Sequence, residues 1–414
     1  MTHKKIIENF SYLSALQIFN IMLPLITYPY LIRVLGQDVY GLVVFVQAII
    51  GYIVILIRFG FTISATKNIA IHRNDKSKLS EIVSSVLIIK SILFLLILII
   101  FVIIVCITPM IYNYKVLFML TMWMCIYEIL FPTWYFQGIE QMKYITYITL
   151  FGRIVFLCLV FILINKSDDY LFIPIINAIV SLTVGFISLF IIFYKHKIKF
   201  VFQPIHILNY YFKESIPIFV SNVSTSLYVN MGKVLVGTYI GMKEVAYYDL
   251  AEKITNLFKM PHAILSQSVF PQINRDKNIS FVRKLSKIYF ILTLCFITFV
   301  LLFSEYFVSF LGGELMMPSV GILNIFILTV PIVAMSNIFG VLTLIPFGYS
   351  KAFTKVIMMS FLVYLFQIFL LFFLGMVSVY SISIILVITE IFVTCRMYFY
   401  CKKYNLWTKN GVII

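Results

Sequence analysis

Long apolar runs recur along the chain from near its start to near its end, separated by short polar links. Most runs reach roughly 20 residues, the length that a helix needs to cross a hydrocarbon core of about 30 Å. Their continuity disfavours a transmembrane barrel, whose strands alternate apolar and polar residues. We predict twelve membrane-spanning helices, at residues 11–32, 40–62, 82–108, 116–137, 144–165, 171–194, 215–240, 246–272, 288–310, 319–346, 356–374 and 378–401.

Two pairs of similar segments suggest that the chain is built from two halves. "VLGQDVYGLVVF" at 34–45 resembles "YIGMKEVAYYDLA" at 239–251, and each joins the first two helices of its half. "YFQGIEQMK" at 135–143 and "IPFGYSKAF" at 345–353 each follow the fourth helix. Matches in the same order favour parallel repeats, with a transport site between them. The predicted parts are an N-terminal lobe at 1–195, a cytoplasmic linker at 196–214 and a C-terminal lobe at 215–414.

Composition and charge placement agree with a membrane protein. Hydrophobic residues make up 62% of the chain and charged residues 12%, whereas soluble domains have about half and a quarter. The net charge of +16 arises mainly from links on the side that carries both termini. The positive-inside rule places this side in the cytoplasm. The positive net charge is therefore explained by membrane orientation, and we expect no nucleic-acid partner.

Ionisable side chains inside the predicted helices are the candidates for function. Each costs about 2.5–3.5 kcal/mol on insertion scales, so it needs a partner, an interior face or a route to the interface. Helical spacing places polar residues in stripes on the first two helices of each half, which favours a polar central cavity. The basic residues predicted to bind substrate there are Arg58, Lys90, Arg153, Lys233, Lys253 and Lys259. The neutral residues predicted to line the cavity are Gln17, Asn20, Gln47, Asn222, Ser226, Asn230 and Asn256.

Several of these residues also have a simpler interpretation. Arg58 and Lys90 lie close enough to the cytoplasmic ends of their helices for their charges to snorkel to the interface. Lys253 can pair with an acid one helical turn away. The acidic residues that could couple transport to an ion gradient are Glu128, Asp249 and Glu252.

Catalytic and cofactor motifs are missing from the sequence. It contains no HExxH, no P-loop and no dinucleotide fingerprint. The six cysteines have neither paired spacing nor neighbouring histidines, so they indicate no disulfide framework or metal site. We expect a protein that is not an enzyme, with no catalytic residue, metal or cofactor.

Three ordered segments resemble the signatures of a known family. They are "LIRVLGQDVYGLVVFVQAIIGYIVILIRFGFTISATKNIA", "FPTWYFQGIEQMKYIT" at 131–146 and "VAYYDLAEKITNLFKMPHAILSQSVFPQI" at 245–273. The family is that of the Wzx O-antigen flippases, within the multidrug/oligosaccharidyl-lipid/polysaccharide exporter superfamily. The residue two before the glycine of "FGF" is often acidic in this family, whereas here it is Arg58. That departure puts in doubt a coupling role for an acid at this position.

The resemblance implies a fold and a function. The fold is an all-α integral membrane protein, MATE-like, with twelve helices in two pseudo-symmetric six-helix bundles around a cationic central cavity. The function is alternating-access transfer of undecaprenyl-diphosphate-linked O-antigen units, for lipopolysaccharide, from the cytoplasmic to the periplasmic leaflet of the bacterial inner membrane. Arg and Lys suit a diphosphate. Membrane lipids, and the polymerase and chain-length regulator of the same pathway, are the further partners considered.

Two other functions remain open at this point. A multidrug exporter of the same superfamily would need an anionic cavity for cationic drugs, which the basic residues disfavour. A membrane-embedded polymerase or ligase of the same pathway would need a large extracytoplasmic loop, and the links between the predicted helices are short.

Overall fold

The structure is a computed structural model that describes residues 3–407. Residues 1–2 and 408–414 lie outside the description, as do the side chains at 3–18, 20, 21, 110, 221, 224, 225 and 271. Every regular element in the described part is helical. The described helices divide into two compact units: unit 1 takes Met1–Val39 and Phe45–Ser226, and unit 2 takes Tyr40–Val44 and Leu227–Ile414. The change of unit thus falls within a helix, farther along the chain than the predicted linker.

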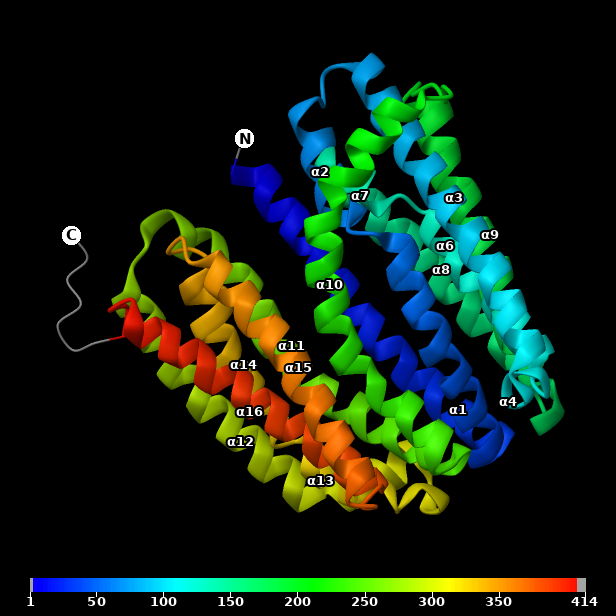
Figure 1. Cartoon of the computed structure of the whole chain (residues 1–414), viewed down its shortest axis with the longest axis vertical. Helices are drawn as coiled ribbons and strands as arrows, with labels where there is room; N and C mark the ends of the chain where they lie inside the picture. The colour runs from blue at the N-terminus through cyan, green and yellow to red at the C-terminus, as the bar shows by residue number, and fades with distance from the viewer. Residues whose placement is uncertain (1–2, 408–414) are drawn as a thin grey trace. The chain divides into compact units, whose positions relative to one another are not determined.

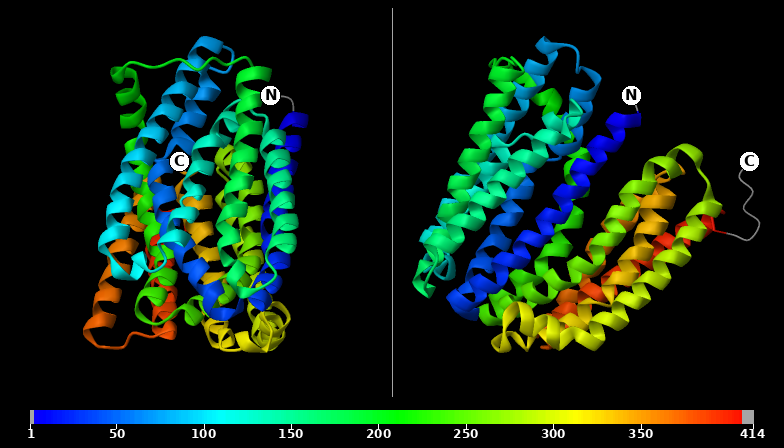
Figure 2. Two further views of the ribbon diagram at one scale, coloured as in Figure 1. Left: turned by 90° about the vertical axis from the view of Figure 1, so that its right-hand side faces the viewer. Right: turned by 180° about the vertical axis from the view of Figure 1, so that it is seen from behind.

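Unit 1 is formed by the first nine α-helices, apart from Tyr40–Val44 of α1, and by α10 as far as Ser226. Helix α9 packs against both α6 and α8, and α2 packs against α7 (Figures 1 and 2). The elements are α1 (His3–Arg58), α2 (Phe61–Ile71), α3 (Lys76–Ile107), α4 (Pro109–Tyr112), α5 (Lys115–Thr121), α6 (Trp123–Leu130), α7 (Thr133–Gly138), α8 (Met142–Leu163), η1 (Ser167–Leu171), α9 (Phe172–Phe190) and η2 (Ile191–Lys195).

Unit 2 contains the last part of α10, from Leu227, and the helices that follow it, together with Tyr40–Val44 of α1. Helix α16 packs against both α14 and α15, and α11 packs against α13. The elements are α10 (Ile205–Tyr239), α11 (Met242–Asp276), α12 (Ile279–Gly312), η3 (Glu314–Met316), α13 (Ser319–Phe326), α14 (Thr329–Phe339), η4 (Gly340–Leu344), α15 (Ser350–Phe373) and α16 (Val379–Lys403).

The first two predicted helices form the single long element α1, which bends at Gly36 (φ 76°, ψ 170°). Gly241 occupies the matching position in the second half, between α10 and α11. Both glycines lie in the segments that suggested a repeat, so the similarity falls on equivalent bends. The prediction for the second helix was wrong at its end, because α1 stops at Arg58 rather than at residue 62. Phe59 (φ 44°) and Gly60 (φ 77°) interrupt the helix there.

Nine helical stretches in the described part are long and apolar enough to cross a membrane, and the first, Met22–Ile71, runs through the bend in α1. Helices α10 and α11 occupy the seventh and eighth predicted positions but fall outside this set of nine. Twelve crossings therefore stay a prediction. Large apolar side chains cover the outside of α3, including Leu95, Ile99 and Ile103. Such a continuous apolar surface suits contact with lipid.

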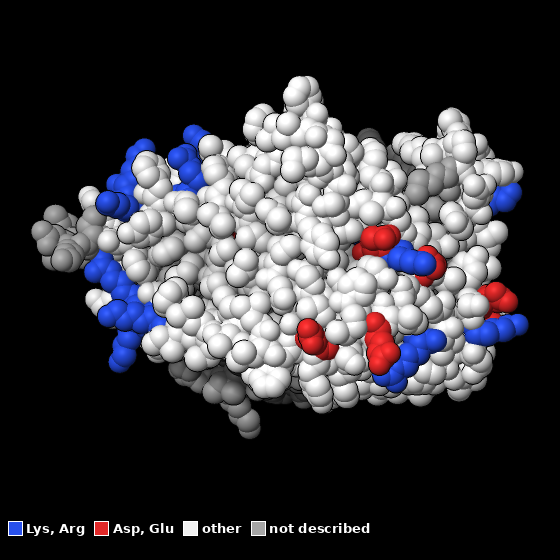
Figure 3. Space-filling view, turned by 90° about the horizontal axis from the view of Figure 1, so that it is seen from below, with Lys and Arg blue, Asp and Glu red and all other residues white. Residues whose placement is uncertain are grey.

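Charged side chains occupy little of the face seen in Figure 3, where acidic and basic groups occur in small clusters on a mostly uncharged surface. The apolar stretches themselves each contain an 18-residue window with at most two charged residues. The charges inside the helical units consequently stand out as candidates for a functional site.

Candidate functional site

Three charged side chains meet inside unit 1, contributed by α1, α3 and α6. The carboxylate of Glu128 accepts hydrogen bonds from Arg58 Nη2 at 3.2 Å and from Lys90 Nζ at 3.1 Å, through different oxygens. Lys90 also donates to the backbone carbonyl of Glu128 at 3.0 Å. One acid pairs with two cations, so the group keeps an excess positive charge.

The burial of these side chains decides between two interpretations left open by the sequence. The Lys90 side chain is 1% exposed and bound to Glu128, so the snorkelling interpretation is wrong for this residue. A buried ammonium persists only where a counter-charge and hydrogen bonds compensate its lost hydration, and Glu128 supplies both. Arg58 is 47% exposed. It lies in the last turn of α1, where a cation also interacts favourably with the helix dipole.

A cavity of about 300 Å³ opens beside this group. Arg58 and Glu128 contribute to its wall, together with Arg153 of α8, whereas Lys90 does not. Within the described part of the chain, no acidic side chain lies within ion-pair distance of Arg153. The remaining polar lining was not predicted and comes from Tyr127, Thr149, Asn177 and Ser181. The available signal was Asn177, a lone amide in the otherwise apolar run "FIPIINAIV".

A second charged cluster lies in unit 2 and is centred on Asp249 of α11. Its carboxylate accepts from Lys233 of α10 at 2.7 Å and from the Tyr40 hydroxyl at 2.8 Å, and it also pairs with Lys253. Lys233 makes a second ion pair with Glu252 at 2.7 Å, and Lys253 donates to the Tyr40 hydroxyl at 2.5 Å. The expected pairing of Lys253 with Asp249 is confirmed. Two acids balance two lysines, so this cluster has no excess charge.

The other predicted residues are dispersed. Lys259 is half-buried, and the acids that act on it electrostatically are Glu390 and Glu252. Gln17 and Asn20 fall among the side chains outside the description. The other five predicted neutral residues do not line the 300 Å³ cavity. Gln47, Asn222 and Ser226 are half-buried, and Asn230 and Asn256 are exposed. Their common cavity stays a prediction.

These features define a multi-pass helical membrane protein that carries charged clusters among its apolar helices. Residues 6–277 match the family described as "Polysaccharide biosynthesis protein", so the chain belongs to that family. It is 26% identical over 405 residues to the "Putative O-antigen transporter" of Escherichia coli (strain K12), covering 96% of this chain and 97% of the relative. A protein of the same name from Shigella dysenteriae is 26% identical over 357 residues, which cover 84% of this chain and 88% of the relative.

Solved structures identify the fold. The "Lipid II flippase MurJ, inward closed conformation" superposes with a TM-score of 0.76 at 15% identity, over 94% of this chain and 87% of that chain. The structure "Inward-facing conformation of a multidrug resistance MATE family transporter of the MOP superfamily" superposes with a TM-score of 0.73 at 14% identity. The superposition covers 94% of this chain and 100% of that chain. The predicted family and the MATE-like all-α fold are confirmed. At these identities the superpositions show the fold alone, because one fold hosts many functions.

Proposed function

We propose that the protein transfers undecaprenyl-diphosphate-linked O-antigen units from the cytoplasmic to the periplasmic leaflet of the inner membrane. The family and the names of the two relatives support export of a lipid-linked polysaccharide. The observation that carries the finer proposal is the cavity in unit 1, where two arginines and one glutamate share a wall within the apolar helices. Its excess positive charge suits a diphosphate.

The two arginines differ in what they can offer a phosphate. A guanidinium presents donors in a planar fork that matches phosphate oxygens, and this attraction strengthens away from bulk water. Glu128 holds Arg58 in position, whereas Arg153 has no acidic partner within ion-pair distance among the described residues. We therefore assign the principal phosphate contact to Arg153 and a supporting contact to Arg58. The hydroxyl and amide groups of Tyr127, Thr149 and Asn177 suit sugar hydroxyls.

The acidic residues considered for ion coupling have a different role in this proposal. Glu128, Asp249 and Glu252 are all ion-paired with basic side chains in the described part of the chain. Each therefore neutralises and orients a cation in this conformation. Transport proceeds by alternating access, in which a head group shifts the population between two states according to its affinity for each.

The multidrug alternative shares the fold but not the expected chemistry. A cationic drug entering the 300 Å³ cavity would meet two arginines and a glutamate already engaged by Lys90 and Arg58. The repulsion between a cationic drug and these like charges would weaken binding. The cavity consequently favours an anionic substrate.

Replacement of the arginines tests the assignment. We expect Arg153→Ala to lower transport about tenfold or more, the equivalent of losing about 1.4 kcal/mol of stabilisation. Arg58→Ala should also impair transport, whereas Arg58→Lys, which keeps the charge beside Glu128, should largely retain it. The measurement is surface O-antigen restored to a strain that lacks the protein, at matched protein levels.

Arg275→Ala serves as the matched control, because Arg275 is exposed and pairs only with its chain neighbour Asp276 among the described residues. This variant should behave as the wild type. Full transport by Arg153→Ala and Arg58→Ala would contradict the assignment of the cavity.

A further inference from the structure

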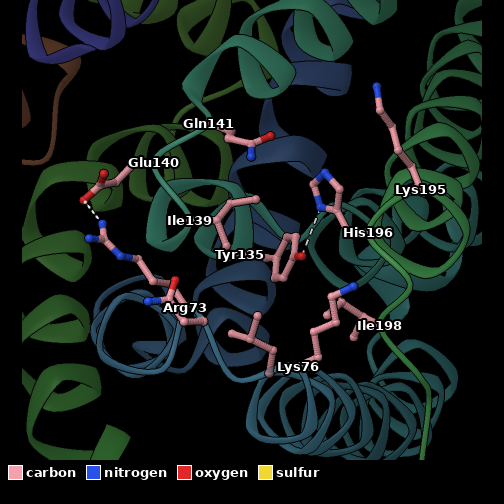
Figure 4. A pocket seen from close by; sticks show the side chains of 11 residues that line it. Arg73, Lys76, Tyr135, Ile139, Glu140, Gln141, Lys195, His196 and Ile198 are labelled. Carbon is pink, nitrogen blue, oxygen red and sulfur yellow. Dashed lines mark hydrogen bonds and ion pairs between the residues drawn. The ribbon is translucent and has the colours of Figure 1, made fainter. Parts of the chain in front are cut away.

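A second, larger cavity, of about 610 Å³, lies in unit 1, and Figure 4 shows the side chains that line it. Three apolar stretches have an end at this cavity: Lys76–Ile107, Lys115–Gly138 and Ser167–Lys195. The ends of membrane-spanning helices lie at the level of the lipid head groups. The cavity therefore opens where the phosphates of a bilayer are found, and on the side that the positive-inside rule assigns to the cytoplasm.

Basic side chains dominate the charge of this cavity. Arg73, Lys76 and Lys195 line it, and Glu140 is the one acid in the lining. Arg73 Nη1 pairs with Glu140 Oε1 at 3.2 Å, and Figure 4 shows this pair on the opposite side from Lys195. One carboxylate cannot neutralise three cations, so the cavity keeps two positive charges in excess.

Neutral donors and acceptors lie between these charges. The Tyr135 hydroxyl and His196 Nδ1 share a hydrogen bond of 3.0 Å, and Asn74 and Gln141 complete the polar lining. The volume falls in the range of about 300–1,000 Å³ that is usual for small-molecule sites. An anion that carries hydroxyl or amide groups would find partners here as well as charge.

The backbone around the cavity departs from regular helix at three places. The π-helical turn η2 delivers Lys195 to the cavity, and Glu140 (φ 59°) and Lys197 (φ 58°) adopt the left-handed conformation. Such backbone is costly for residues other than glycine and concentrates at functional sites. These departures place side chains from two separate loops around one space.

The second signature segment, 131–146, also converges on this cavity. Tyr135, Ile139, Glu140 and Gln141 all belong to it and all line the cavity. The transport site proposed above uses none of these residues, so that proposal leaves the segment without a role. A ligand at the cavity supplies one.

We propose that this cavity is a binding site for a phosphate-bearing anion, namely the phosphorylated head group of a lipid in the adjacent leaflet. The position at head-group depth favours a lipid over a dissolved phosphate compound. The excess positive charge of the lining attracts the phosphate. The amide and hydroxyl groups of the lining contact the rest of the head group. This site is separate from the 300 Å³ cavity and does not depend on the direction or substrate of transport.

The test is titration of the full-length protein with inorganic pyrophosphate, in micelles of a maltoside detergent, which contains no phosphate, at low salt. We expect saturable binding that weakens about tenfold or more in Lys76→Gln/Lys195→Gln, since charge-assisted phosphate contacts are lost. Lys199→Gln is the matched control, because Lys199 is an exposed cation nearby that does not line the cavity. It should change the affinity by less than about twofold, as expected for an exposed charge.

Lys195→Arg protects the test from a folding defect, since it keeps the charge and should retain binding. Absence of saturable binding to the wild type would overturn the proposal, as would an equal loss in Lys199→Gln. A second titration, in the same micelles with added phosphatidylglycerol or undecaprenyl diphosphate, distinguishes the sources. A lipid ligand will raise the apparent Kd for pyrophosphate, whereas an unchanged Kd will assign the site to a soluble phosphate compound and overturn the lipid assignment.

Discussion

At the scale of single residues, the ion pairs of Glu128 show why buried charges occur in groups. Lys90 is almost completely buried, and it donates hydrogen bonds to a carboxylate oxygen and to the backbone carbonyl of Glu128. Removing Glu128 would leave the buried Lys90 ammonium without its counter-charge, which costs about 3–5 kcal/mol, whereas removing both costs much less. The pair therefore requires both members, whatever its net contribution to stability.

We predict that Glu128→Gln lowers the free energy of unfolding by about 3–5 kcal/mol and that Lys90→Met/Glu128→Gln recovers much of this loss. Unfolding by denaturant in mixed micelles would measure both. The double-mutant cycle isolates the pair from effects elsewhere. An unchanged free energy of unfolding for Glu128→Gln, or additive losses in the double variant, would contradict the pairing.

His196 gives the 610 Å³ cavity a pH dependence. Its pKa lies below the ordinary value because the ring is buried, and because the charges of Lys195 and Lys76 oppose protonation. The ring therefore gains its proton at a lower pH than an ordinary histidine does. A bound anion offsets the neighbouring lysines and favours the protonated ring, so acidification should strengthen anion binding.

We predict that His196→Gln binds pyrophosphate progressively more weakly than the wild type as the pH falls from about 7 to about 5.5, the range in which an ordinary histidine titrates. The remaining charged or titratable groups around the cavity are Arg73, Glu140 and Tyr135, with Tyr144 beside the ring. The comparison between variants cancels the protonation of pyrophosphate itself. Parallel pH profiles for the two proteins would show that His196 does not titrate at this site.

At the scale of elements, the break between α1 and α2 explains the "FGF" stretch. Phe59 stacks between Phe212 and Phe219 of α10, with ring centroids 4.4 Å from each. Gly60 has φ 77°, and a Cβ atom there would lie 3.0 Å from Ile218 Cβ and from the Phe219 nitrogen. The glycine therefore permits both the left-handed turn and the close approach of α10.

We predict that Gly60→Ala lowers the free energy of unfolding by about 1–3 kcal/mol, through backbone strain and crowding. Gly51→Ala is the control on the preceding helix, because a Cβ atom at Gly51 would have no neighbouring atom within 4 Å and the backbone there is helical. Alanine should be neutral there or stabilising by up to about 1 kcal/mol. Denaturant unfolding of the two variants compares them directly, and equal stabilities would argue against the proposed strain.

The sequence predicts helices better than it predicts their ends. Apolar runs located helices in all twelve predicted ranges, because lipid exposure demands continuous apolar residues. The end of the second range depends on how α10 packs against Gly60, which no periodicity contains. The third and fourth predicted elements show the same difference: α3 is one unbroken helix, whereas 116–137 is divided among α5, α6 and α7.

At the scale of the whole molecule, the family and fold were accessible from the sequence because ordered motifs and internal similarity extend over most of the chain. The charge pairings were not accessible. Helical spacing predicted polar stripes on the helices that carry Tyr40 and Asp249, but only tertiary packing brings these two side chains within 2.8 Å. The sequence placed Glu128 inside a predicted helix. Its ion pair with Lys90, however, depends on α3 and α6 coming close together at these two residues.

The central claim is that this protein moves a lipid-linked saccharide across the membrane. The most direct measurement labels undecaprenyl-diphosphate-linked O-antigen units in a strain that lacks the protein and determines which leaflet holds them. We expect single units to accumulate on the cytoplasmic face of that strain, and the wild-type chain to restore their transfer. Accumulation on the periplasmic face would contradict it and indicate a lost polymerisation step, and unchanged units with altered drug sensitivity would favour a multidrug exporter.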